Sequence, residues 1–169
     1  NPTDIPDNLT SFYDTNIRIA DNTKSKIKFN NEVLHQSKLI NYFNGDYSKS
    51  KIEKDINNFL KKIKKNKKYF FSKKDQIFLE ALKIDGIKIS DKYDDLYEKD
   101  DSEIPTDLQV MINNDEKGAA LMRIVEVIGQ DKLDRIDEDT IYFIVHTLNQ
   151  LNIDQLRNTI LLKVLPLKV

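Results

Sequence analysis

Ser72-Lys-Lys-Asp75-Gln-Ile-Phe-Leu-Glu-Ala-Leu-Lys-Ile-Asp-Gly86 carries both ends and the buried face of a predicted helix. Ser72 and Asp75 have the spacing at which two side chains accept hydrogen bonds from the free backbone N–H groups of a helix start. Gly86 suits the left-handed conformation that ends many helices. The apolar side chains expected to be buried are Ile77, Phe78, Ala81 and Leu82. The stretch therefore predicts an α-helix.

A second helix is predicted directly before the first. Ser50 and Glu53 have the spacing of a capping box, and Asn66 lies near the predicted end. The apolar stripe of this helix consists of Ile52, Ile56, Phe59 and Ile63. Because only residues 67–71 connect the two helices, we expect an antiparallel pair.

Similar start and stop signals occur on both sides of this pair. Further helices are predicted from Asn30 or Asn31 to Gly45, from Pro105 to Ile112, from Asn114 or Asp115 to Gly129, from Asp137 to Asn152, and from Asp154 to Pro166. Alternating residues at 16–20 and 26–29 predict a small β-hairpin near the N-terminus. The predicted fold is all-α, with antiparallel helical pairs arranged as a bundle or a short α-solenoid.

An acidic stretch between Ser90 and Glu103 is the best candidate for a linker. We predict an N-terminal helical region with a basic helical hairpin at residues 1–97, an acidic linker at 98–104 and a C-terminal helical bundle at 105–169. The alternative is that the two helical regions pack as one domain.

The composition excludes several classes of protein. Only 4 Gly and 4 Pro are present, too few for an all-β fold rich in hairpins. The absence of Cys excludes disulfides, thiol catalysis and cysteine-ligated metals. No run approaches the roughly 18 apolar residues of a membrane-spanning helix, so we expect a soluble protein, cytoplasmic or periplasmic. Since the chain begins with Asn1, we expect a piece of a longer protein or a processed product.

Charge is distributed unevenly along the chain. Residues 24–74 contain 15 Lys and 4 acidic residues, a net charge of +11, whereas residues 75–139 contain 8 basic and 19 acidic residues, a net charge of −11. One hypothesis is a surface that binds a polyanion, either nucleic acid or an anionic membrane, by charge and by stacking on aromatic rings. Its residues are Lys61, Lys62, Lys64, Lys65, Lys67, Lys68 and Tyr69, interleaved with Phe70 and Phe71.

The alternative interpretation is that these lysines form a solvated helix face and the aromatic residues belong to the core. We favour it because the whole chain has a formal charge of only −1 and the basic segment lacks Arg. Arg is the side chain whose planar fork suits phosphates and base edges. The chain contains 23 Lys and 4 Arg, a bias that AT-rich codons produce without selection on function.

The two histidines do not predict a catalytic or metal site. His35 with Ser37 and His146 with Thr147 suggest a small hydrolase, but neither pair is accompanied by a nucleophile elbow or oxyanion glycines. Neither histidine has a metal-ligating partner four residues later. The acidic stretch lacks the central glycine of a calcium-binding loop. We therefore expect no enzyme activity, no cofactor and no bound metal.

Three short motifs carry a resemblance near the C-terminus. They are Glu126-Val-Ile-Gly129, Asp137-Glu-Asp-Thr-Ile-Tyr-Phe-Ile-Val145 and Leu156-Arg-Asn158. Residues 118–169 resemble the C-terminal helical part of uncharacterised proteins from AT-rich alphaproteobacteria. The resemblance implies a helical end domain of a larger bacterial protein and carries over no functional residue.

Helix caps and apolar stripes account for nearly every residue that could otherwise belong to a site. We therefore expect a protein-protein interaction or scaffolding domain with a protein partner. The alternative is a polyanion binder that acts through the Lys-rich segment 50–74. A small hydrolase is the third and least favoured hypothesis.

Overall fold

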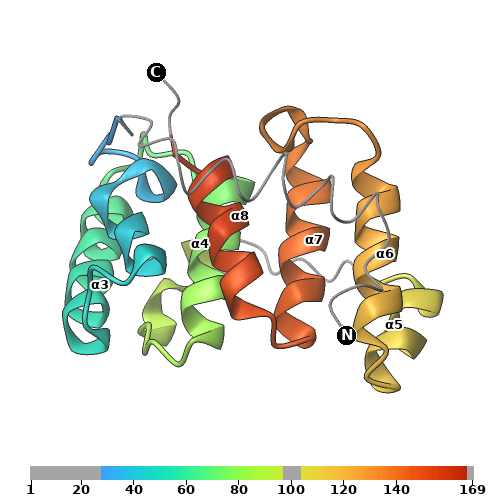
Figure 1. Cartoon of the computed structure of the whole chain (residues 1–169). Coiled ribbons are helices and arrows are strands. Elements are labelled where there is room, and N and C mark those ends of the chain that lie inside the picture. The colour runs from blue at the N-terminus through green and yellow to red at the C-terminus, as the bar shows by residue number, and fades with distance from the viewer. Residues whose placement is uncertain (1–27, 97–103, 167–169) are drawn as a thin grey trace. The chain divides into compact units, whose positions relative to one another are not determined.

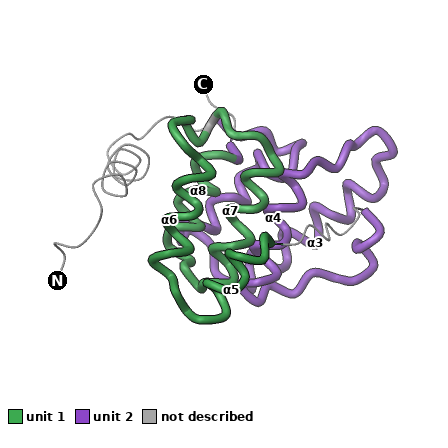
Figure 2. The backbone as a smooth tube through the Cα atoms, turned by 90° about the vertical axis from the view of Figure 1, so that its right-hand side faces the viewer, with its two compact units in different colours: residues 1–26, 103–164 green, residues 27–102, 165–169 purple. Residues whose placement is uncertain are grey.

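The computed structural model describes residues 28–96 and 104–166 of the 169-residue chain (Figure 1). Within these residues there are α-helices α3 to α8 and 3₁₀-helices η3 to η6. The chain forms two compact units, which are coloured separately in Figure 2. Of the described residues, 28–96 and 165–166 belong to unit 2 and 104–164 belong to unit 1.

The all-α prediction is confirmed, because the described residues form helices and connecting turns without a β-strand. The predicted hairpin falls outside these residues except for its last two positions, and the predicted linker falls outside them except for Ile104. Among the described helices, none has both the length and the apolar character needed to cross a membrane.

The predicted antiparallel pair forms part of unit 2. Its helices are α3, Lys49–Lys65, and α4, Lys73–Ile84. Lys49 Nζ donates a 2.9 Å hydrogen bond to the backbone carbonyl oxygen of Asp85, which follows α4. The start of α3 therefore lies beside the end of α4, as two helices joined by a short turn require.

Both ends of α4 agree with the sequence prediction. The side chain of Ser72 accepts a hydrogen bond from the Asp75 N–H, and the Asp75 carboxylate accepts one from the Ser72 N–H. Gly86 has a φ of 80°, the left-handed conformation predicted for it, and Ile87 just beyond it is buried. These interactions stop the helix on both sides because they satisfy its terminal backbone groups locally.

The start of α3 differs from the prediction by two residues. The N-cap is Ser48, whose ψ of 153° is extended and whose hydroxyl accepts a hydrogen bond from the Lys51 N–H. The predicted capping box of Ser50 and Glu53 is therefore wrong, because Ser50 already lies inside the helix. A cap needs an extended backbone, and in this chain Ser48 has it.

Exchange of each serine for alanine distinguishes the two caps. Ser48→Ala should lower the free energy of unfolding by about 1 kcal/mol, because it removes the acceptor at the start of α3. Ser50→Ala should have a much smaller effect, since alanine favours a helix interior. Urea titration of both variants measures the difference. Equal losses, or a larger loss for Ser50→Ala, would contradict the assignment of Ser48.

The buried stripe of α3 is close to the predicted one. Ile52, Ile56 and Ile63 are buried as expected. Leu60 is the fourth buried residue, and the predicted Phe59 is only half-buried. Both residues continue the stripe, since each lies three or four positions from Ile56 and from Ile63, so the spacing alone does not decide which one is covered.

The α-helix predicted between residue 30 and Gly45 is wrong. Two 3₁₀-helices occupy this stretch, η3 at Leu34–Gln36 and η4 at Lys38–Asn44. Ser37 separates them with an extended backbone, a ψ of 165°, and its hydroxyl accepts a hydrogen bond from the Leu39 N–H. Gly45 does end η4 in the left-handed conformation, with a φ of 85°.

Side chains from elsewhere in unit 2 explain this interruption. The Leu34 N–H donates to the hydroxyl of Tyr69, and the His35 N–H donates to the carboxylate of Asp75, both at 2.9 Å. These donors are therefore fixed by partners that lie 35 and 40 residues away in sequence. Local periodicity cannot reveal such partners.

Unit 1 consists of short helices whose main contacts join neighbours in sequence. Its elements are α5 (Thr106–Asn113), α6 (Lys117–Ile128), η6 (Leu133–Arg135), α7 (Glu138–Gln150) and α8 (Asp154–Val164). α5 contacts α6, α6 contacts α7, and α7 contacts α8. Leu108, Ala120 and Leu151 form a small apolar core within this unit.

Most predicted ends in unit 1 are confirmed. Asp137 caps α7, and Gly129 and Asn152 have φ values of 60° and 55° where the preceding helices end. The start of α6 differs, because Asp115 adopts a φ of 56° in the turn and Glu116 becomes the N-cap.

The face that α8 buries includes a charged residue. Leu156 is half-buried, whereas Arg157 is fully buried. The guanidinium of Arg157 donates to the side-chain oxygens of Asn149 and Asn158, at 3.0 Å and 2.8 Å. Hydropathy treats Arg as an exposed residue, but these hydrogen bonds and the carboxylate of Asp154, 3.4 Å from the guanidinium, compensate for the burial of its charge.

Candidate functional site

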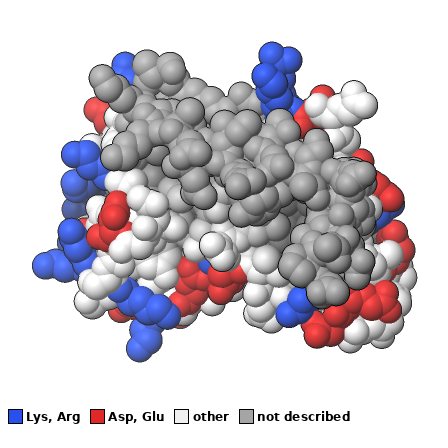
Figure 3. All heavy atoms as spheres, in the orientation of Figure 1, with Lys and Arg blue, Asp and Glu red and all other residues white. Residues whose placement is uncertain are grey.

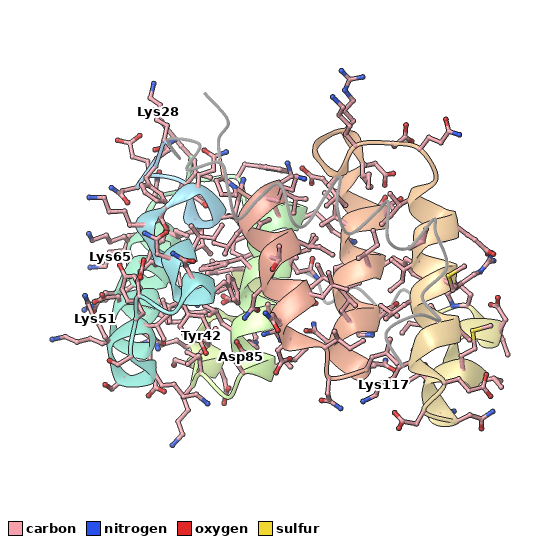
Figure 4. All side chains as sticks on the ribbon, in the orientation of Figure 1. Lys28, Tyr42, Lys51, Lys65, Asp85 and Lys117 are labelled. Atoms are coloured by element: carbon pink, nitrogen blue, oxygen red, sulfur yellow. The ribbon has the colours of Figure 1, made fainter. Side chains whose placement is uncertain are left out.

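The predicted lysines gather at the C-terminal end of α3 and in the connection to α4. Figure 3, in which α3 lies at the left, displays Lys and Arg atoms along that edge, and Lys65 points outward from α3 in Figure 4. All six predicted lysines are exposed, and for five of them no ion pair to a carboxylate occurs in the described residues. We call these five residues, together with Phe70, the basic tip: Lys61, Lys62, Lys65, Lys67 and Lys68.

The aromatic residues of the connection divide between the interior and the surface. Residues 69–71 precede α4 without helical structure. Tyr69 is half-buried, and its hydroxyl both accepts from the Leu34 N–H and donates to Asp75. Phe70 is 85% exposed. The ring available to a partner is therefore that of Phe70, whereas the predicted Tyr69 holds the connection in place.

Lys64 differs from the other predicted lysines because its ammonium group already has partners. It donates to both carboxylate oxygens of Asp95, at 2.8 Å and 2.9 Å, and to the backbone carbonyl oxygen of Lys92. Asp95 belongs to η5, Asp91–Leu96. An ammonium group has three donors, so these contacts occupy Lys64 fully.

The segment that carries Asp95 runs along α3 in the direction of that helix. Glu53 accepts from the Lys88 N–H, and Asn57 both donates to the Lys88 carbonyl oxygen and accepts from the Ser90 N–H. The segment reaches Lys64 through Asp95 at its far end. We call residues 85–96 the docked segment. Part of the predicted acidic stretch is thus held against the basic helix.

A buried polar cluster supports the basic tip from inside unit 2. The carboxylate of Asp75 accepts hydrogen bonds from four donors: the backbone N–H and ring Nδ1 of His35, the hydroxyl of Tyr69 and the N–H of Ser72. The four distances lie between 2.7 and 3.1 Å. A carboxylate offers about four acceptor positions, so those of Asp75 are filled.

The environment of this cluster shifts two pKa values in opposite directions. Burial favours the neutral form of Asp75, but the hydrogen bonds from His35 and Ser72 outweigh it and hold the pKa of the carboxyl below its ordinary value. Burial raises the pKa of Tyr69 well above its ordinary value, and the neighbouring Asp75 adds to this effect. The cluster therefore combines a carboxylate with a neutral phenol.

An imidazole, a carboxylate and a hydroxyl meet in this cluster, but not as in nucleophilic catalysis. The hydroxyl of Ser72 lies 3.4 Å from Nδ1 of His35, the same nitrogen that donates to Asp75. In a catalytic triad the nucleophile faces the other ring nitrogen. Nε2 of His35 lies 3.3 Å from the side-chain amide of Gln36 instead. The geometry of this cluster therefore fits a structural hydrogen-bond network and not a catalytic triad.

The other pairs considered for hydrolysis make local contacts. Ser37 donates to the Leu34 carbonyl oxygen, and Thr147 donates to the Phe143 carbonyl oxygen. His146 stacks on Tyr142 with ring centroids 5.8 Å apart. The described residues contain no group of three His, Asp or Glu side chains placed to bind a metal.

The fold and site define an all-α protein in which the C-terminal end of one helix and the connection that follows it carry the basic tip, five exposed lysines and an exposed phenylalanine. Comparison with protein-family models, curated proteins and solved structures finds no match to this chain.

Proposed function

We propose that this protein is an interaction module that binds an acidic segment of a protein partner through the basic tip. The observation that carries the proposal is the 85% exposure of Phe70 beside five lysines without ion pairs in the described residues. Phe is one of the aromatic residues enriched in the buried part of protein interfaces, and the rim around that part is typically polar.

The anchoring of Tyr69 supports the same proposal. Its hydroxyl joins η3 and α4 through Leu34 and Asp75, so the neighbouring Phe70 is attached to a rigid connection. A connection whose backbone is fixed before binding loses less conformational entropy when a partner covers it. The part of the basic tip that carries Phe70 is therefore held in place before a partner binds.

Polyanion binding is the second candidate, and the run of exposed lysines favours it. Two features support an acidic protein over nucleic acid. The basic tip contains no Arg, the residue best suited to phosphates and bases, and it offers one ring where strand binding uses a series of stacking rings.

Binding of the full chain to two labelled polymers, a random copolymer of Glu and Tyr and oligothymidylate, tests the proposal. We expect the full chain to bind a random copolymer of Glu and Tyr, and Phe70→Ala to weaken this binding about tenfold. A Lys61→Glu, Lys65→Glu double variant should weaken it by at least as much, and the loss should shrink as salt screens the charges. Fluorescence anisotropy at several salt concentrations provides the measurement.

Lys117→Glu with Lys132→Glu is the matched control, because it makes the same change in net charge within unit 1. If both double variants weaken binding equally, general electrostatic attraction explains the result and the basic tip is not a site. If oligothymidylate binds more tightly than the copolymer and Phe70→Ala has no effect, the polyanion hypothesis replaces the proposal.

A further inference from the structure

The basic helix already holds an acidic ligand, its own docked segment. Tyr93 of η5 is buried, and its hydroxyl donates to the Asn57 carbonyl oxygen. The side chain of Asn57 pairs with the backbone of Lys88 and Ser90. Backbone contacts of this kind fix the register of the segment along α3, so the carboxylate of Asp95 reaches Lys64 and no other predicted lysine.

The contact between Lys64 and Asp95 differs from these buried contacts. The side chains of Lys64 and Asp95 are 40% and 66% exposed. Exposed ion pairs contribute little to stability and exchange readily with other charges. A carboxylate from outside can therefore replace Asp95 while Tyr93 and Asn57 continue to hold the docked segment.

We propose that Asp95 is an internal competitor for the basic tip, so that an acidic protein segment must displace it to reach Lys64. This inference rests on the proposed function. It assigns the partner a carboxylate that takes the place of Asp95, close to an aromatic or apolar side chain that covers Phe70. Free of Asp95, Lys64 adds a sixth ammonium group to the site.

Two neighbouring aspartates make a matched test. Asp95→Asn frees Lys64, whereas Asp94→Asn makes the same charge change beside Lys83 of α4, the partner of Asp94 at 2.9 Å. With the copolymer of Glu and Tyr and the full chain, Asp95→Asn should increase affinity about two- to fivefold at low salt, and Asp94→Asn should increase it clearly less. Adding Lys64→Gln to Asp95→Asn should remove the gain.

Equal gains from the two aspartate variants would overturn the competition, as would a gain that persists when Lys64 is replaced. Neither result would affect the proposed function, provided that Phe70→Ala still weakens binding. If the wild-type chain does not bind the copolymer, the proposed function fails and the competition fails with it. Circular dichroism of each variant shows whether a change in affinity reflects a change in fold.

Discussion

Replacing Asp75 with Asn should lower the free energy of unfolding by about 3 kcal/mol, although the two side chains have nearly the same size. Asp75 is fully buried and accepts from four donors. The Asn side chain has one oxygen and turns an NH₂ group toward donors, so at least one buried donor of His35, Tyr69 or Ser72 loses its acceptor. Urea denaturation measures the loss.

Asp137→Asn is the control for this prediction. Asp137 also caps a helix, but it is exposed, and Asn is as good an N-cap as Asp. This variant should therefore change stability very little. If Asp75→Asn has an equally small effect, Asp75 contributes only a helix cap. The hydrogen-bonded cluster around it then does not hold the connection between α3 and α4 in place.

The pH dependence of stability provides a second measurement on the same residue. The folded-state pKa of Asp75 lies below its ordinary value of 3.8, so its carboxylate stabilises the fold above that pH. This stabilisation is lost as the pH falls through the lower, folded-state pKa. The difference between the wild type and Asp75→Asn should accordingly be constant near neutral pH and shrink below about pH 4.

Phe78→Ala should lower the free energy of unfolding by about 4 kcal/mol. Phe78 is fully buried in α4 and meets the ring of Phe43 edge-on, with centroids 5.7 Å apart. Removal of the ring leaves a cavity between α4 and η4 and ends this aromatic contact. Thermal and urea unfolding of the variant measure the loss.

Phe70→Ala is the control for Phe78→Ala, because it makes the same substitution at an exposed phenylalanine. Because Phe70 is 85% exposed, its removal should leave the stability nearly unchanged while it weakens binding of the acidic copolymer. A large loss of stability from Phe70→Ala would mean that its ring packs inside the protein. The role of Phe70 in the basic tip would then be withdrawn.

Helix ends were predictable wherever the partners of the terminal backbone groups lie within a few residues. Ser72 with Asp75, Gly86 and Asp137 satisfy such groups within one turn, so their spacing is visible in the sequence. Ser50 shows the limit of this reasoning. Two serines compete at the start of α3, and only the backbone conformation of Ser48 decides between them.

The positive charge of the candidate site was predictable from the sequence. Which aromatic ring is exposed there, and which lysine already has a partner, was not. The run of lysines identified the region, and all six of them are exposed. Which aromatic ring faces outward depends on Tyr69, whose hydroxyl partners lie in η3 and at the start of α4. The occupation of Lys64 depends on Asp95, which lies 31 residues away.

The sequence alone determined that this chain is all-α, where most of its helices begin and end, and that its positive charge gathers near residues 61–68. These properties depend on interactions within one or two helical turns. Only the tertiary structure decided that the stretch before Gly45 forms 3₁₀-helices, that Phe70 is exposed and that Lys64 is occupied. Each of these outcomes depends on a hydrogen bond or ion pair between residues more than thirty positions apart, and local spacing carries no information about such partners.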